Sequence, residues 1–286
     1  MRAAPLLLLP ALLAAGCESE FDNPFANATR TVPPRATAAV VFTSTINTPA
    51  GGREAYAIDA DGSGLTQLTF CGAADRLCDI ASISPAPDRQ RVVARRRLDA
   101  NGNARLEDGD GAALVFMDLV RSTQAELVPA ATQVSAIDWA ETGDVLVYAA
   151  TGDGGLEDLF RADPNGANNR NLTASATVRE RGGRVDPNAT VAVYERLDPG
   201  AKTAIFVFVD RTRQVRITTP GEGTAALAGT PYVVGSDADG DFSPDGGSIV
   251  FRRLTGTGAG GLGTWDIMTV RTDGTGLAVV AGGPDF

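Results

Sequence analysis

The chain contains no histidine among its 286 residues. Histidine is the commonest general base near neutral pH, the usual activator of a serine or cysteine nucleophile, and the commonest zinc ligand. The sequence also lacks a G-x-S-x-G nucleophile elbow and a phosphate-binding P-loop. These absences exclude the Ser-His and Cys-His hydrolases. Carboxylate-pair hydrolysis stays open, because the chain has 35 Asp and Glu residues.

An excess of basic residues is missing as well, since the formal net charge is −10 and the sequence pI is about 4.6. This acidity argues against nucleic acid or an anionic membrane surface as the main partner. The apolar run near the N-terminus falls short of the roughly 20 residues that a membrane-spanning helix needs. We therefore expect neither nucleic-acid binding nor a transmembrane anchor.

Residues 1–16 are typical of an export signal. Arg2 supplies the positive start, Leu6–Leu13 the apolar core, and small residues precede Cys17. This arrangement looks like a bacterial lipoprotein box, which implies cleavage before Cys17 and its diacylation. The alternative is an ordinary secretory signal cut near Ala15. By resemblance to the lipoprotein sorting rule, Glu18 after the cysteine predicts the outer membrane, facing the periplasm.

Residues 17–34 are polar, contain three prolines and show no periodicity, so we expect a flexible tether. Residues 35–286 repeat one unit, and Asp239–Ala281 is its cleanest copy. Turn residues such as Pro244, Gly246 and Gly274 separate β-branched strands in this copy. Weaker copies recur at irregular spacings of about 45 to 60 residues.

One four-stranded antiparallel meander cannot cover both of its faces, so the copies must stack on one another. The sequence therefore predicts an all-β fold, a β-propeller of four-stranded antiparallel blades. Five repeats are detectable, and six blades are the alternative if residues 220–236 contain further strands.

The segment Phe242-Ser243-Pro244-Asp245-Gly246, together with the turn Asp59–Leu65, resembles the WD40-like propeller repeat of the TolB family. The resemblance covers roughly Ala36–Phe286. It implies a propeller that binds partners and has no catalysis of its own, as TolB does in the Tol–Pal envelope system. The first copy lacks a first strand, and Gly282–Phe286 matches the lead-in to one. We expect this C-terminal strand to complete blade one and close the ring.

Cys71 and Cys78 lie in the connection between blades one and two. With Cys17 used for the lipid, two thiols remain in an exported protein, and an oxidising compartment favours their pairing as a disulfide. The alternative, a metal or redox pair, lacks further ligands and the usual C-x-x-C spacing.

The loop Leu98–Asp110 resembles a calcium-binding loop of the EF-hand type, in which oxygen atoms at fixed positions surround the ion. The candidate ligands are Asp99, Asn101, Asn103, the backbone carbonyl of Arg105, Glu107 and Asp110. Two positions depart from the pattern: Ala104 replaces the usual glycine, and Asp110 the usual glutamate. The alternative is an acidic, solvated hairpin loop between the second and third strands of blade two. No other cofactor is required.

Two classes of function remain. The first is a non-catalytic, periplasm-facing lipoprotein whose propeller binds an envelope protein or a peptidoglycan-associated partner. The second is a carbohydrate-active or other hydrolase that uses carboxylates around the propeller channel. Paired inward-facing acids would favour the hydrolase, and a mixed polar and apolar lining would favour the binding protein. We expect Trp139 and Trp265 to be core and turn residues rather than a sugar-stacking platform.

Overall fold

A computed structural model describes residues 39–45, 52–70, 77–99, 101–107, 110–132, 134–152, 154–197, 202–209, 213–258 and 262–282. The predicted signal and tether lie outside these ranges. Within them, all the extended regular structure is β-strand. No helix in the described part of the chain is long and apolar enough to cross a membrane.

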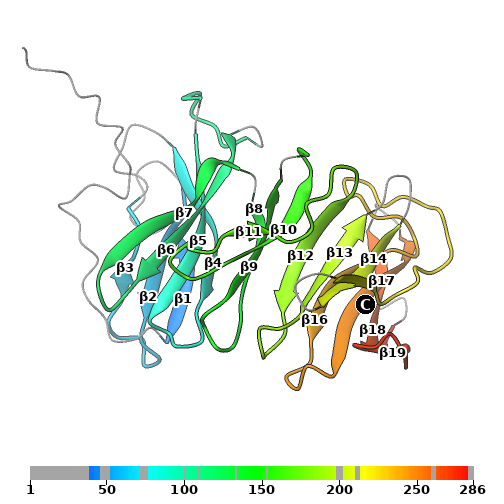
Figure 1. The fold of residues 1–286 in the computed structure, drawn as a ribbon. Coiled ribbons are helices and arrows are strands. Elements are labelled where there is room, and N and C mark those ends of the chain that lie inside the picture. Colours follow the sequence, from blue (N-terminus) through cyan, green and yellow to red (C-terminus); the bar gives the residue numbers. More distant parts are fainter. Residues whose placement is uncertain are drawn as a thin grey trace, which may run out of the picture.

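The strands form five antiparallel sheets, each built from consecutive strands (Figure 1). The first sheet has three described strands: β1 (Val40–Ser44), β2 (Glu54–Ile58) and β3 (Thr66–Gln67). The second comprises β4 (Cys78–Pro85), β5 (Arg91–Leu98), β6 (Ala112–Asp118) and β7 (Thr123–Thr132). The third comprises β8 (Val134–Trp139), β9 (Leu146–Thr151), β10 (Glu157–Ala162) and β11 (Arg170–Asn171). The fourth comprises β12 (Arg179–Val185), β13 (Ala192–Leu197), β14 (Thr203–Val209) and β15 (Arg213–Arg216). The fifth comprises β16 (Asp237–Phe242), β17 (Ser248–Thr257), β18 (Gly263–Arg271) and β19 (Ala278–Ala281).

The turns have the chemistry that the repeats predict. Gly62 and Gly274, in the Asp-Gly turns, both have a φ of +84°, which favours glycine. The carboxylate of Asp61 accepts hydrogen bonds from the backbone N–H and the hydroxyl of Ser63, at 2.9 and 2.7 Å. Asp273 accepts the same pair of bonds from Thr275. These aspartates therefore shape turns, as expected from the sequence.

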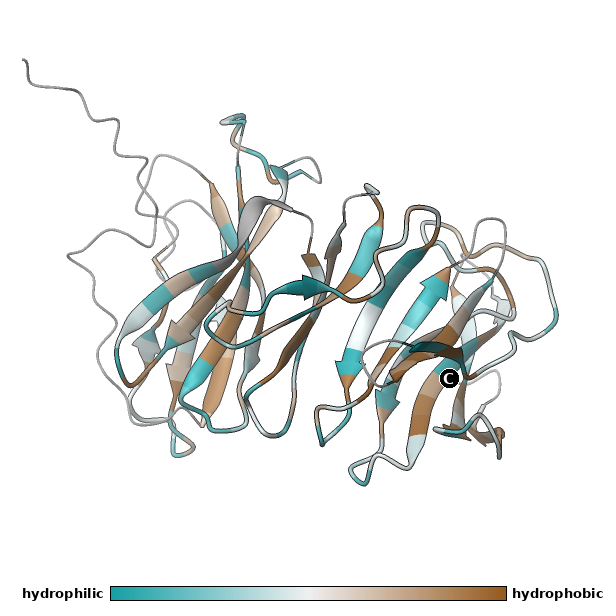
Figure 2. Cartoon of the chain, in the orientation of Figure 1, coloured by the Kyte–Doolittle hydropathy of each residue, from teal (hydrophilic) through white to brown (hydrophobic). Residues whose placement is uncertain are grey.

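The core lies between the sheets as four apolar clusters, one for each pair of consecutive sheets. Successive side chains of a strand point to opposite faces, so one strand serves two clusters. Val147 packs between the third and fourth sheets, whereas its neighbour Tyr148 packs between the second and third. Figure 2 shows the hydrophobic stretches concentrated in the strands. Each inner sheet is thus apolar on both faces.

The sheets meet along their first strands. In sheets two to five, the strands β4, β8, β12 and β16 contact both the preceding sheet and one another in chain order. The outermost strands, such as β11 and β15, make no comparably extensive contact with another sheet in the described part. Sheets joined at one edge and separated at the other radiate from an axis, as the blades of a propeller do. The predicted fold class is confirmed.

Two details of that prediction have different outcomes. Residues 220–236 form a loop with an isolated bridge between Ala226 and Val233, and they build no sixth sheet. The predicted closing strand falls on residues 283–286, outside the described ranges, so it stays a prediction. Figure 1 shows β1–β3 and β16–β19 on opposite sides of the view, with β8–β11 between them.

The close approach of the third and fourth sheets generates a stability prediction. A Cβ atom on Gly183 in β12 would overlap Leu159 Cδ1 and lie 3.1 Å from Val147 Cγ1. Gly183→Ala should therefore lower the free energy of unfolding by about 1–3 kcal/mol, because overpacking forces the two sheets apart. Urea denaturation measures this difference. Gly247→Ala is the control, since its Cβ would meet Asp245 only at 3.4 Å or more. Equal effects of the two variants would contradict the prediction.

Candidate functional site

The four first strands place polar side chains of three kinds at one equivalent position. In each strand this residue pairs with a valine of the next strand: Val93, Val147, Val193 or Val250. The four residues, named here the inner ring, are Ser84, Asp138, Arg184 and Asp241. Because β4, β8, β12 and β16 contact one another in order, the inner ring lies along the propeller axis.

A β-bulge interrupts each of these strands near the inner ring. A bulge bends the strand and redirects its side chains, and bulges are frequent beside functional sites. In β12 the bulge contains Gly182, with a φ of +67°, and in β16 it contains Asp239, with a φ of +54°. A left-handed aspartate is uncommon and is held here by its surroundings.

Asp138 is the most buried carboxylate of the inner ring. Its Oδ2 accepts a hydrogen bond of 2.9 Å from the backbone N–H of Val185, in the following sheet. Burial raises the pKa of Asp138 above its usual value, and the charge of Asp241 adds to this effect. The Val185 N–H and the Arg184 guanidinium act in the opposite direction. Arg184 therefore favours the charged form of Asp138 and offsets part of the effect of Asp241 on it.

A pocket of about 640 Å³, including its open mouth, adjoins the inner ring at the first three sheets. Ser84 and Asp138 line it together with apolar residues such as Val41 and Pro85. Trp139 also lines it but is only 7% exposed, and its indole N–H donates to the Ser84 carbonyl at 3.0 Å. Trp139 is thus a core residue, as expected. The pocket combines polar and apolar groups.

A second polar cluster surrounds Glu195 in β13, next to the bulges of β12 and β16. This carboxylate is 2% exposed. It accepts hydrogen bonds from the Asp239 N–H at 2.8 Å, Tyr232 Oη at 3.0 Å and Arg181 Nε at 3.1 Å. Glu195 therefore fixes the left-handed Asp239 and ties the fourth sheet to the fifth.

Aromatic and cationic side chains extend this cluster outwards. The Arg181 guanidinium lies 4.9 Å from the centre of the Tyr232 ring, and that of Arg252 lies 4.1 Å from the Trp265 ring. The two rings meet edge to face at 5.5 Å, and Arg252 pairs with Asp239 at 2.5 Å. Trp265 is half-buried and packs against Arg252 and Tyr232. It belongs to this cation–π network and not to one of the four apolar clusters.

The sequence alone did not identify these sites. In the sequence, Asp138 and Asp241 are recognisable only as strand and turn residues, and no motif contains Arg184. Aligning the four repeats on their strand-to-turn segments would have shown the shared position. Glu195 could not be found in this way, because its partners come from separate strands and from the loop 220–236.

The predicted calcium loop lies between β5 and β6, the second and third strands of its sheet, as expected. Asp99 accepts hydrogen bonds from the backbone N–H groups of Gly102, Asn103 and Ala104, at 2.7, 3.2 and 2.7 Å. Ala104 has a φ of +59°, the conformation for which calcium loops use glycine. Asp110 contacts the Asn101 amide at 3.2 Å and the Glu107 N–H at 2.7 Å.

The donor set fits calcium only in part. Across the residues that the structure describes, no group of three or more His, Cys, Asp or Glu side chains gathers closely enough to hold a metal ion. Asn103 and the Arg105 N–H instead form a local turn. The loop is therefore held by its own hydrogen bonds, and calcium binding stays a prediction.

The cysteine predictions fall largely outside the described ranges. Cys78, at the start of β4, is disulfide-bonded. Cys71 lies outside those ranges, so its pairing with Cys78 stays a prediction. Cys17 lies outside them as well, and its lipidation is untested.

No protein-family model matches this chain, and no curated protein matches it. Solved structures do resemble it. TolB from Acinetobacter baumannii superimposes with a TM-score of 0.56 at 13% identity, covering 89% of this chain and 55% of that one. A putative TolB from Agrobacterium tumefaciens gives 0.52 at 14% identity, covering 80% and 75%.

The fold is that of a TolB-like β-propeller. An oligogalacturonate lyase in complex with manganese also superimposes, with a TM-score of 0.59 at 14% identity, over 86% of this chain and 62% of that one. This chain spans little more than half the length of the Acinetobacter TolB. Because a related propeller is an enzyme, the shared fold alone does not decide the function.

Calcium binding by the loop can be tested through stability. Excess calcium should raise the melting temperature relative to chelator, because a ligand that binds only the folded state stabilises it. The double variant Asn101→Ala, Asn103→Ala should lose this difference. Asp99→Ala should destabilise under both conditions, since three backbone N–H groups lose their acceptor. Identical melting temperatures of the unmodified protein with calcium and with chelator would contradict the calcium prediction.

Glu195 generates a prediction about pH. Burial raises its pKa above the ordinary value of 4.5, so ionisation disfavours the folded state. Its contribution to stability is therefore fully present below pH 4.5 and is lost as pH rises through the raised pKa. Relative to Glu195→Gln, the unmodified protein should lose stability as the pH rises above 4.5. Urea denaturation at each pH measures the difference, with the exposed Glu222→Gln as control. A difference that grows in favour of the unmodified protein with pH would refute it.

Proposed function

We propose that this chain is a non-catalytic, lipid-anchored envelope protein whose propeller binds a protein or peptidoglycan-associated partner at its inner ring. The export signal and Cys17 support the location, with the mature protein on the outer membrane and facing the periplasm. The resemblance to the TolB family supports partner binding. Neither nucleic acid nor a required cofactor enters this function.

The observation that carries the proposal is the mixed chemistry of the inner ring. Four equivalent positions hold a hydroxyl, a carboxylate, a guanidinium and a second carboxylate, and the adjoining pocket adds apolar groups. The strands repeat closely, yet this position holds serine, aspartate, arginine and aspartate in successive blades. Such an asymmetric polar set suits one orientation of a partner, because polar groups fix register and apolar groups supply affinity.

The test reverses the charge of the inner ring. Immobilised mature protein is incubated with detergent-solubilised envelope proteins and, separately, with purified peptidoglycan. Arg184→Glu should lose the bound partner at least about tenfold, since a third acid beside Asp138 repels the matched group. Arg213→Glu, on the outer strand β15, is the matched control. A partner retained equally by both variants would contradict binding at the inner ring.

The proposed lipid anchor at Cys17 is tested by fractionating cells that express the protein. Cys17→Ser should move the protein from the membrane fraction to the soluble envelope fraction, because the acyl chains supply the membrane affinity. An unmodified protein already found in the soluble fraction would contradict lipidation.

A second candidate function rests on Asp138. Its raised pKa beside the acidic Asp241 is the combination that a carboxylate-pair glycosidase needs for its general acid and its partner. Arg184 opposes this interpretation, because its charge favours the ionised form of Asp138, whereas a general acid must be protonated. Release of reducing ends from acidic polysaccharides or peptidoglycan, lost in Asp138→Asn with folding preserved, would establish the hydrolase and overturn the non-catalytic proposal.

A further inference from the structure

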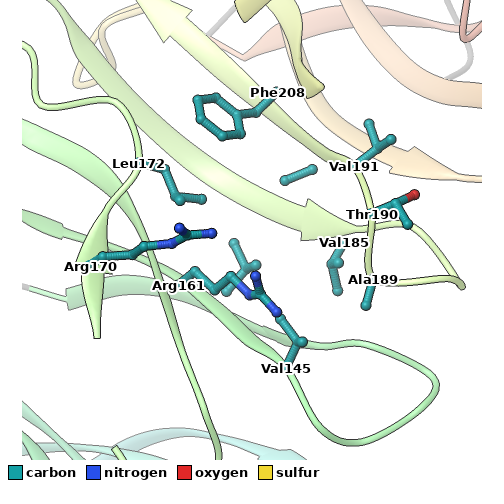
Figure 3. A pocket seen from close by; sticks show the side chains of 11 residues that line it. Val145, Arg161, Arg170, Leu172, Val185, Ala189, Thr190, Val191 and Phe208 are labelled. Atoms are coloured by element: carbon teal, nitrogen blue, oxygen red, sulfur yellow. The ribbon is translucent and has the colours of Figure 1, made fainter. Parts of the chain in front are cut away.

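The pocket beside the inner ring has room for a further side chain. The space left inside it is about 280 Å³, near the lower limit of ligand sites. By contrast, the opening around Leu172 and Phe208, between the third and fourth sheets (Figure 3), leaves about 20 Å³, enough for about one water molecule. The opening in Figure 3 is therefore a gap in the core, whereas the pocket beside the inner ring can take a ligand group.

Most of the described residues that line this pocket are apolar. Val41 comes from β1, Pro85 from the end of β4, and Trp139 from the end of β8. The polar lining residues in the described part are Ser84, Arg89 and Asp138. Apolar walls with a carboxylate among them suit a group that has an apolar stem and a cationic end.

Asp138 is the acid of this pocket, and no arginine or lysine in the described part of the chain forms an ion pair with it. Its Oδ2 accepts the Val185 N–H at 2.9 Å. Other carboxylates of the first and second strands are better matched. Three of them each pair with an arginine, at 2.6 to 3.1 Å: Asp79 with Arg53, Glu195 with Arg181, and Asp237 with Arg253.

Buried carboxylates without an arginine are compensated in another way. Among the described residues, Asp158 and Asp186 have no such partner, but each accepts at least three hydrogen bonds. A carboxylate withdrawn from water needs one kind of compensation or the other. Asp138 has less of either, because the Trp139 N–H and the charge of Arg184 add only smaller effects to the bond from Val185. A cationic group in the pocket would supply what Asp138 lacks.

We propose that this pocket takes the side chain of a lysine of the protein partner, whose ammonium group pairs with Asp138. This inference rests on the proposed function, because the partner is the one bound at the inner ring. The four-carbon stem of the lysine lies against the apolar walls, as lysine stems do on apolar surfaces. The Ser84 hydroxyl offers the ammonium group a further acceptor.

The surroundings of Asp138 favour lysine over arginine. Because Oδ2 already accepts the Val185 N–H, the carboxylate does not present two free oxygens to the fork of a guanidinium. An ammonium group is a compact point charge, so one oxygen is enough for it. Arg89, the cationic residue of the described lining, is exposed and opposes a second basic group. The pocket therefore matches a single lysine with an acid beside it better than a run of basic residues.

The site is tested by NMR of the isotope-labelled mature protein with n-butylammonium, which reproduces the lysine stem and its charge. The chain contains two tryptophans, of which Trp139 lines the pocket. Its indole N–H donates to the Ser84 carbonyl there, so its resonance should shift saturably, whereas that of Trp265 should not move. n-Butanol has the stem without the charge, and it should need at least about a tenfold higher concentration for half of the shift.

Two variants place the effect at Asp138. Asp138→Asn should raise the half-saturating concentration of n-butylammonium at least about tenfold, because the ion pair is lost. Glu141→Gln is the matched control, since this exposed acid follows Trp139 closely in the chain but does not line the pocket. Equal concentrations for the two variants, or for n-butylammonium and n-butanol with the unmodified protein, would overturn the proposal. Tighter binding of n-propylguanidinium would overturn the choice of lysine.

Capture of the partner tests its lysine directly. Solubilised envelope proteins are either acetylated, which removes the charge of their lysines, or reductively methylated, which keeps it. The immobilised mature protein should retain its partner after methylation and lose it at least about tenfold after acetylation. Equal retention after the two treatments would overturn the proposal, and retention of purified peptidoglycan alone would overturn the choice of a protein partner.

Failure of the proposed function gives a different result. The unmodified protein then retains no partner from untreated envelope proteins, whereas the n-butylammonium titration still shows whether Asp138 holds an ammonium group. A partner that is retained equally by the Asp138→Asn and Glu141→Gln variants would leave partner binding intact and refute the pairing of its lysine with Asp138.

Discussion

The structure depends on the burial of both faces of each inner sheet against its neighbours. Each sheet is a single meander with apolar side chains on both sides, and alternate residues of one strand, such as Val147 and Tyr148, enter different clusters. The last sheet shows what this burial requires. Val193 is fully buried by the fifth sheet, whereas its equivalent Val250 is 41% exposed, with no following sheet in the described part. Stability therefore arises between blades more than within them, as in other repeat proteins.

The same packing decides where function can be placed. The first strands approach one another most closely. Where two sheets touch, their residues must be small or lack a side chain, and the residues that face the axis are polar. Gly183 and Gly240 occupy equivalent positions, and a Cβ on either would press against the preceding sheet. The bulges next to them give Gly182 and Asp239 their left-handed conformation. The bulges and the left-handed residues are thus concentrated at the inner ring and near Glu195. The polar side chains at these places do not belong to the apolar clusters between the sheets.

The sequence predicted the framework well because its signals are local. Turn residues such as Gly62 and Gly274 mark the ends of strands, and β-branched runs mark the strands themselves, so the five sheets and the placement of the loop between Leu98 and Asp110 followed. The sites were less predictable because they depend on register and on distant partners. Glu195 receives hydrogen bonds from residues 14 to 44 positions away.

The distribution of charge restricts what a partner of the inner ring must offer. Asp138, Arg184 and Asp241 occupy equivalent positions of three consecutive strands, so a partner that binds them needs groups of both signs of charge. The net charge of −10 keeps a freely diffusing acidic ligand away from most of the surface. An acidic group therefore reaches Arg184 most readily when it belongs to a partner that also carries basic groups for the two aspartates.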